Sequence, residues 1–212
     1  VSAPSCIIVP KRRTDGLYRA ALEGAGRSGL VRPVLLAFRG WRENMRIKRI
    51  EMSATTIATE RFGEVSYRDE DILTFPRGIP AFEDWHRWIL VGSEDNAIKW
   101  LQNLEDPALA LPVTTPDAVR PDYNARIPED ELELVGSMDP ADLALLIVVS
   151  IPEGAPWNMT ANLRAPILLN LKTRRAVQVI ALNEEYPIRH VVFPEDVRDT
   201  MKRAAILQGE TS

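Results

Sequence analysis

Short runs of apolar and β-branched residues follow one another from Thr55 onward, and turn residues separate them. Short runs bounded by Gly, Pro, Asn or Asp are typical of β-strands. Two such runs, within "TTIATERFGEVSY", flank Phe62–Gly63 and predict a hairpin. The other predicted strands are Ile72–Phe75, Arg87–Val91, Ile98–Leu104, Leu109–Thr115, Leu143–Ile151, Ala165–Thr173 and Ala176–Leu182.

The run Leu143–Ile151 is apolar at nearly every position, so we expect it to be a central strand buried on both faces. The long helical patterns that a parallel α/β fold places between its strands are missing. The pattern therefore predicts a mainly β protein: an antiparallel β-barrel-like domain, or a sandwich, with a few short helices.

Three segments carry helix signals. The segment Pro128–Gly136 begins with Pro and acids and stops at Gly, and Asp139–Pro140 resembles an N-cap followed by the first helical residue. A third helix is expected to begin at Pro194, with Lys202 and Arg203 near its C-terminus, where the helix dipole favours cations. Val197, Met201, Ala204 and Ala205 are predicted to share one face of this helix. We expect residues 194–212 to be this helix and a frayed tail.

Charge divides the 212-residue chain into unlike parts. Residues 1–51 contain 11 Lys and Arg against 4 Asp and Glu, a balance of +7, and the remaining 15 and 26 leave −11. We interpret residues 1–51 as a basic, disordered extension, or as upstream sequence before a natural start at Met52. A basic arm for nucleic acid or membrane is the alternative. The acidic domain, residues 52–193, argues against direct nucleic-acid binding and favours basic protein partners.

Candidate catalytic chemistry is sparse. The sequence has one cysteine, Cys6, and two histidines, His86 and His190, and no zinc-type spacing, P-loop or nucleophile elbow. We interpret His190 as a hydrogen-bonded structural residue and His86 as a surface neighbour of Trp85 and Trp88. No membrane-length apolar run and no export signal are evident, and the single cysteine fits the cytoplasm. The residues therefore predict no specific catalytic, cofactor or metal site, although folding could bring two of the many carboxylates together as a catalytic pair.

The segment "ILTFPRGIPAFEDW", Ile72–Trp85, combines rigid and apolar residues in a predicted loop. Pro76 and Pro80 restrict the backbone, and Gly78 permits a turn. Such a loop either plugs the end of a β-sheet core or presents a surface to a partner. Farther on, Asn162 interrupts an apolar pattern, so we expect its side chain to fix the local backbone by hydrogen bonds.

Five blocks in order resemble the FliW family of flagellar assembly factors, over roughly Thr55 to His190. They are "TERFGEVSYRDEDILTFPRGIPAFED" (Thr59–Asp84), "WLQNLEDPALALPV" (Trp100–Val113), "PDY" (Pro121–Tyr123), "MTANLRAPILLNLKTRRAVQVI" (Met159–Ile180) and "YPIRH" (Tyr186–His190). The chain departs from the family at Ala81, where glycine is usual. If that position needs a positive φ, alanine there costs stability.

The resemblance implies a barrel-like fold without enzymatic activity that acts in the bacterial cytoplasm. It implies two partners, flagellin and the RNA-binding translational repressor CsrA. The free factor would bind CsrA and relieve repression of flagellin translation, and accumulating flagellin would displace CsrA.

We expect the partner surface to include Phe82, Glu83, Leu104, Asp106 and Tyr123. We expect Pro76, Gly78, Pro80, Asn162 and Pro166 to shape that surface. The alternative function is a small-molecule β-barrel protein or enzyme that binds a flavin or a sugar in a deep pocket.

Overall fold

The structure, a computed structural model, describes residues 54–93, 95–136 and 139–209. The expectations for residues 1–51 therefore lie outside the described residues. The strands are β1 (Thr55–Thr59), β2 (Gly63–Tyr67), β3 (Ile72–Thr74), β4 (Arg87–Val91), β5 (Lys99–Asn103), β6 (Ala110–Thr114), β7 (Leu143–Ser150), β8 (Thr160–Ala161), β9 (Ile167–Asn170), β10 (Ala176–Gln178) and β11 (His190–Val191). The helices are α3 (Glu129–Val135), α4 (Glu195–Gly209) and the short 3-10 turns η1 (Asp69–Asp71), η2 (Pro116–Ala118), η3 (Pro140–Asp142) and η4 (Pro156–Asn158).

The main sheet pairs its strands in the order β10-β9-β7-β6-β5-β4-β3, with β8 and β11 attached beside β7. Every ladder in this sheet is antiparallel, as predicted. The two edge strands approach each other at one parallel bridge, Thr74 with Arg175, where the Thr74 amide donates to the Arg174 carbonyl at 2.8 Å. The sheet is thus barrel-like without being closed, which confirms the predicted mainly β class.

Pro76 explains why the pairing of the two edges stops there. The Phe75 amide donates to the His86 carbonyl, and the next residue along, Pro76, has no N–H to donate. The chain then turns, with the Gly78 amide donating to the Phe75 carbonyl at 3.0 Å. The loop Phe75–His86 leaves the strand direction, and the outer edge of β10 continues without it.

The core lies on both faces of the curled sheet. The inner cluster includes Phe75, Trp88, Leu101 and Leu146, all at most 4% exposed. The adjacent β4 residues Ile89 and Val91 face outward and pack under the β1–β2 hairpin. Strand β7 contributes to three clusters, which confirms that it is central and apolar on both faces.

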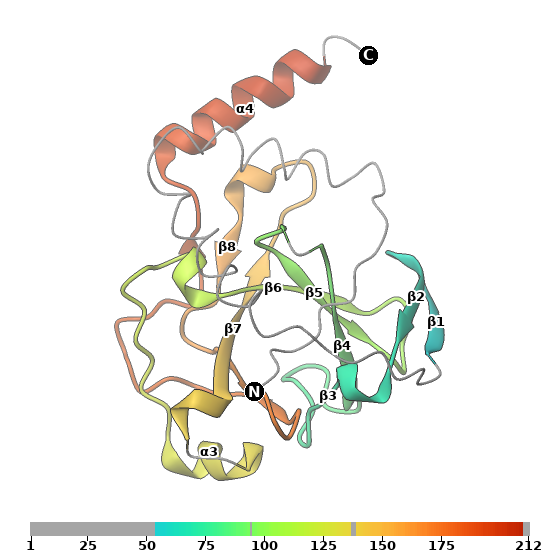
Figure 1. The fold of residues 1–212 in the computed structure, drawn as a ribbon. Coiled ribbons are helices and arrows are strands. Elements are labelled where there is room, and N and C mark those ends of the chain that lie inside the picture. The colour runs from blue at the N-terminus through green and yellow to red at the C-terminus, as the bar shows by residue number, and fades with distance from the viewer. Residues whose placement is uncertain (1–53, 94, 137–138, 210–212) are drawn as a thin grey trace.

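The helices follow their sequence signals with some differences. Helix α3 has acids in its first turn and ends at Gly136, whose φ of 79° is left-handed. Asp139 caps η3, a 3-10 turn, by accepting from the Ala141 amide. Helix α4 packs against η4 and projects from the sheet (Figure 1).

Some predicted details of the secondary structure are wrong. Helix α4 continues to Gly209, so Lys202 and Arg203 lie within it and not at its C-terminus. Strand β10 ends at Gln178. Beyond it, the amides of Val179 and Ala181 still donate to the carbonyls of Pro166 and Arg164, but these bonds form no regular ladder.

Candidate partner-binding surface

The loop Phe75–His86 contains a tight turn at Ile79–Phe82. Ile79 and Phe82 face each other as an antiparallel bridge, with the Phe82 amide donating to the Ile79 carbonyl at 2.6 Å. Pro80 occupies the second position of the turn, and Ala81, at φ 73°, the third. Proline followed by a residue of positive φ defines a type II turn, whose third position favours glycine. Ala81 therefore has the positive φ on which the expected cost in stability depends.

Gly78 is also held in a conformation that side chains disfavour. Its φ is 66°, and a Cβ placed on it would lie 2.5 Å from the Cα and the carbonyl oxygen of Glu83. The Glu83 carboxylate in turn accepts a hydrogen bond from the Ala81 amide at 2.9 Å. The loop is therefore folded back on itself, and Pro80 and Glu83 are exposed on its surface.

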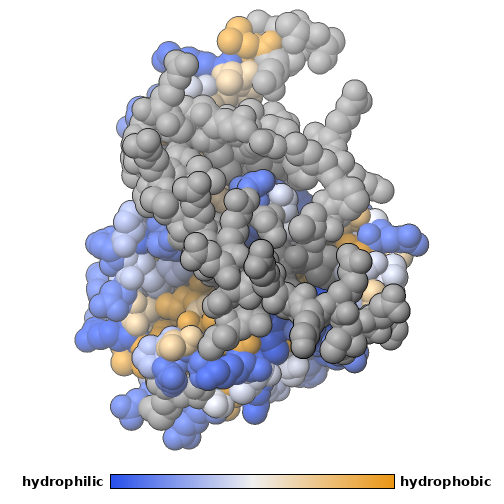
Figure 2. Space-filling model, in the orientation of Figure 1, coloured by the Kyte–Doolittle hydropathy of each residue, from blue (hydrophilic) through white to orange (hydrophobic). Residues whose placement is uncertain are grey.

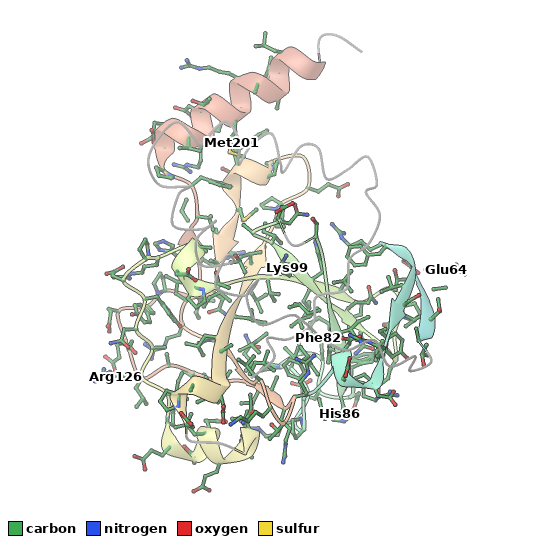
Figure 3. The ribbon with its side chains drawn as sticks, viewed as in Figure 1. Glu64, Phe82, His86, Lys99, Arg126 and Met201 are labelled. Atoms are coloured by element: carbon green, nitrogen blue, oxygen red, sulfur yellow. The ribbon has the colours of Figure 1, made fainter. Side chains whose placement is uncertain are left out.

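The apolar residues of the loop plug the sheet. Phe75 and Ile79 are 0% and 2% exposed and belong to the inner cluster. Phe82 and Trp85 are half-buried against that cluster and contact each other edge to face, with ring centroids 6.2 Å apart. The plug interpretation is confirmed for Phe75 and Ile79. Phe82 shares the plug and still presents part of its ring to solvent, and it lies near His86 beside β3 (Figure 3).

A second loop, residues 104–108, lies against the first. The side-chain oxygen of buried Asn103 accepts from the amides of Glu105 and Asp106 at 2.7 and 2.6 Å. The Glu105 carboxylate accepts from the His86 amide at 2.9 Å, which joins the two loops. Leu104 is half-buried in the cluster under the β1–β2 hairpin. The Asp106 carboxylate is engaged, because it accepts from the Ala108 amide at 3.0 Å.

We call these two loops, residues 75–86 and 104–108, the loop face. Its exposed carboxylates are Glu83, Asp84 and Glu105. Arg77, also exposed, pairs with Glu131 of α3, so the cation nearest the turn is already engaged with a carboxylate. The loop face therefore combines a rigid backbone with the partly exposed Phe82 ring. Its net charge is negative, which complements a basic partner.

Tyr123 belongs to a different part of the molecule. Its ring stacks on Tyr186 with centroids 4.7 Å apart, and its hydroxyl donates to the Leu163 carbonyl at 2.9 Å. Burial raises the pKa of the Tyr123 hydroxyl, so it stays protonated as a donor. The Arg120 guanidinium lies 5.0 Å from the centre of the Tyr186 ring. The "PDY" and "YPIRH" blocks thus meet in space and hold segment 120–126 against segment 182–186.

Asn162 and Pro166 also lie away from the loop face. Asn162 is half-buried, and its side-chain oxygen accepts from the Ala165 amide at 3.0 Å, the backbone-fixing role that the sequence predicted. The buried Pro166 offers its carbonyl to the Val179 amide at 2.9 Å. The structure therefore gathers seven of the ten predicted residues at the loop face and places Tyr123, Asn162 and Pro166 elsewhere. The binding roles of all ten stay predictions.

Three buried asparagines organise this fold, and the sequence analysis missed them. Asn103 is described above; Asn170 accepts from the amides of Lys172 and Thr173, and Asn183 accepts from the Arg126 amide. All three are at most 6% exposed. The available signal was an asparagine within or beside an apolar strand pattern, where its side chain must be hydrogen-bonded, and only Asn162 was predicted on that basis.

The described residues include both histidines and many carboxylates, the candidate groups for catalysis or metal binding. No group of three or more His, Cys, Asp or Glu in the described chain is arranged to hold a metal ion. Burial, together with the charge of Arg120, lowers the pKa of His190, and the described chain shows no hydrogen bond to its ring, contrary to our expectation. His86 is exposed beside Phe75, whose carbonyl lies 2.9 Å from its Nδ1. No described helix is long and apolar enough to cross a membrane.

Comparison with known proteins places this chain in a family. The profile of the FliW protein family matches residues 56–192. A "Flagellar assembly factor FliW" of Pseudothermotoga lettingae is 39% identical over 135 residues, 64% of this chain and 86% of that protein. The Thermotoga maritima protein of the same name is 40% identical over 136 residues, 64% of this chain and 91% of that protein.

A solved structure agrees with the sequence comparison. The crystal structure of the flagellar assembly factor FliW superposes with a TM-score of 0.62 at 31% identity, and covers 66% of this chain and 99% of that one. The matched region contains the main sheet, both loops of the loop face and the Tyr123–Tyr186 stack, and α4 lies beyond it. The family match over residues 56–192 covers more than half of the chain, and the chain therefore belongs to the FliW family.

Proposed function

We propose that this protein is a flagellar assembly factor that binds two cytoplasmic proteins, flagellin and CsrA, and makes or breaks no covalent bond. The observation that carries the proposal is the family match across residues 56–192, since the similar proteins are named flagellar assembly factors. When flagellin is scarce, the protein binds CsrA and relieves repression of flagellin translation. When flagellin accumulates, it binds this protein in place of CsrA, and CsrA is released.

Mass action is sufficient for such a switch. The population of each complex, relative to the free protein, equals the free partner concentration divided by its dissociation constant. If the two complexes exclude each other, flagellin displaces CsrA once its concentration, relative to its dissociation constant, exceeds that of CsrA. No conformational change within the binding protein is then required.

The loop face supports binding to proteins. Its backbone is fixed by the Ile79–Phe82 turn and by Asn103, so little conformational entropy is lost when a partner docks. The inside of the curled sheet is filled by side chains, including fully buried Phe75 and Trp88. Function on this scaffold is therefore better sought on its surface than in a central cavity.

A competition experiment tests the switch. The full chain is mixed with purified flagellin, with CsrA, and with both, and the complexes are separated by size-exclusion chromatography. We expect a complex with each partner alone and release of CsrA as flagellin is titrated in. Failure to bind either protein at cell-like salt, or formation of a stable ternary complex, refutes the partner-switching proposal.

A charge reversal tests the loop face. Asp84→Lys is the suitable variant, because the Glu83 and Asp106 carboxylates also hold backbone amides and their loss would disturb the loops. We expect a several-fold rise in the CsrA dissociation constant that shrinks as salt is added. Glu153→Lys makes the same charge change at an exposed residue away from the loop face. Equal effects of the two variants would show that only net charge matters and that the loop face is not the contact.

A further inference from the structure

Strand β10 has an outer edge that the described residues leave open. The Asn170 amide donates to the Arg175 carbonyl, and the Val179 amide to the Pro166 carbonyl, so odd-numbered residues here direct their backbone groups toward β9 and the segment that precedes it. By strand alternation, the backbone groups of Gln178 and Ile180 point the other way. No described residue bonds to the backbone N–H or C=O of either one.

Contacts close the edge on both sides of this gap. Before it, the bridge from Thr74 to Arg175 joins β3 to β10. After it, the Leu182 amide donates to the Arg126 carbonyl at 2.9 Å, and the Arg126 guanidinium donates to the Leu182 carbonyl at 3.3 Å. The opening therefore spans Gln178 to Leu182, a length that suits a short added strand.

The side chains along this edge are apolar and exposed. Ile180 is 67% exposed and Leu182 53%, whereas the alternating residues Val179 and Ala181 are each 1% exposed. Figure 2 shows hydrophobic surface at the lower left, the side along which the chain after β10 runs in Figure 1. Proteins usually guard open edges with charged residues or proline. This edge instead presents an isoleucine and a leucine two residues apart, so both can contact the same face of an added strand.

Arginines stand at the two ends of the opening. Arg126 and Arg175 are exposed, and neither forms a salt bridge among the described residues, although Arg126 lies close enough to Glu185 for the two charges to interact. The acids of α3 belong to another layer, on the helix that covers Val177 and Val179. An incoming strand with apolar residues at alternate positions and a carboxylate at its end would complement this edge. A basic protein such as CsrA is disfavoured there.

We propose that an extended segment of flagellin adds to β10 as a further strand at Gln178–Leu182. This inference rests on the proposed function, because it gives flagellin a binding mode at an edge that begins at the Thr74–Arg175 bridge, where the loop face also begins, so that bound flagellin would exclude CsrA by its bulk. Up to four backbone hydrogen bonds, two each at Gln178 and Ile180, would form with the segment. Specificity would come from contacts to Ile180 and Leu182.

Two substitutions at Ile180 test the edge. Ile180→Pro removes an outward amide that has no partner within the described chain, and Ile180→Glu keeps the amide and replaces the apolar contact by a repelling charge. Ile188→Glu is the matched control, since Ile188 is 66% exposed and lies off the edge. We expect both Ile180 variants to raise the flagellin dissociation constant about tenfold. We expect Ile188→Glu to leave it within about twofold and CsrA binding to be unchanged in all three. Thermal unfolding checks that each variant is folded. If Ile180→Pro does not fold, the comparison of Ile180→Glu with Ile188→Glu is sufficient to test the proposal.

Amide hydrogen exchange gives the second readout. In the full-length protein alone, the amides of Gln178 and Ile180 exchange rapidly, and flagellin slows them at least about tenfold because they become hydrogen-bonded. Flagellin binding with these amides unprotected and both Ile180 variants at full affinity overturns the edge proposal and leaves the proposed function intact. Protection by CsrA, or protection that rises with protein concentration without any partner, assigns the edge to another occupant and also overturns it. No flagellin binding by the unaltered protein refutes both.

Discussion

Replacing Ala81 by glycine tests whether the Ile79–Phe82 turn holds strain. At φ 73°, the Ala81 Cβ crowds the backbone carbonyl, a cost of roughly 1–2 kcal/mol for a residue other than glycine. Glycine removes this cost and also gives the unfolded chain more freedom, which opposes folding by about 0.4–1 kcal/mol. We therefore expect Ala81→Gly to raise the free energy of unfolding by about 0.5–1 kcal/mol. In a protein of this size that is about 1–4 °C in Tm.

The geometry of the turn makes this prediction specific. The Ala81 amide donates to the Glu83 carboxylate at 2.9 Å, and glycine keeps that amide and its bond. Ala81 is exposed, so its methyl group contributes little burial that could offset the relief. The substitution thus isolates the backbone conformation as the changed quantity.

Urea unfolding followed by tryptophan fluorescence measures the effect, since Trp85 and Trp88 pack beside the turn. The control is Ala58→Gly, at an exposed residue of β1 whose φ is not positive, where glycine should destabilise by about 0.5–1 kcal/mol. Opposite signs for the two variants support the reasoning. If Ala81→Gly destabilises the protein as much as Ala58→Gly does, the turn is not strained and the argument is wrong.

Two other predictions follow from single side chains. Asn103→Ala leaves the amides of Glu105 and Asp106 without their acceptor, so we expect a loss of about 2–3 kcal/mol and a matching fall in Tm by calorimetry; a loss below about 0.5 kcal/mol would contradict the role given to this residue. For His190, a folded-state pKa below the ordinary value means that the unfolded chain takes up the proton first, so stability is full above about pH 6.5 and falls as the pH drops toward the lower, folded-state pKa. His190→Gln should remove that part of the decline between pH 7.5 and 5.5, and an unchanged slope of Tm against pH would exclude His190 as its source.

Much of the fold could be predicted from the sequence because β patterning is local. The alternation and the turn residues placed nearly every strand, and Gly136 and Asp139 marked the helix boundaries correctly. The placement of Lys202 and Arg203 near the C-terminus of α4 was wrong because basic residues within a helix resemble a C-terminal signal. The end of β10 was misplaced because the apolar pattern continues to Leu182 after the regular ladder stops.

The candidate site was less predictable, because it depends on which loops meet. The sequence identified the rigid loop Phe75–His86, but the division of its residues between plug and surface depends on the curl of the sheet. Phe75 and Phe82 read alike in sequence, yet one is fully buried and the other is partly exposed. Tyr123 was grouped with Phe82 by the resemblance alone, and the structure stacks it on Tyr186 instead.

By itself, the sequence determined the class of fold and the family resemblance, and it marked Ala81 as a position where glycine is usual, because each depends on neighbours along the chain. Only the tertiary structure decided that the sheet stops short of closure, that Glu105 joins two loops, and that Gln178 and Ile180 lie on an edge that the described residues leave open. These features depend on hydrogen bonds between residues far apart in sequence. Whether a backbone amide finds such a partner is settled only when the strands are packed.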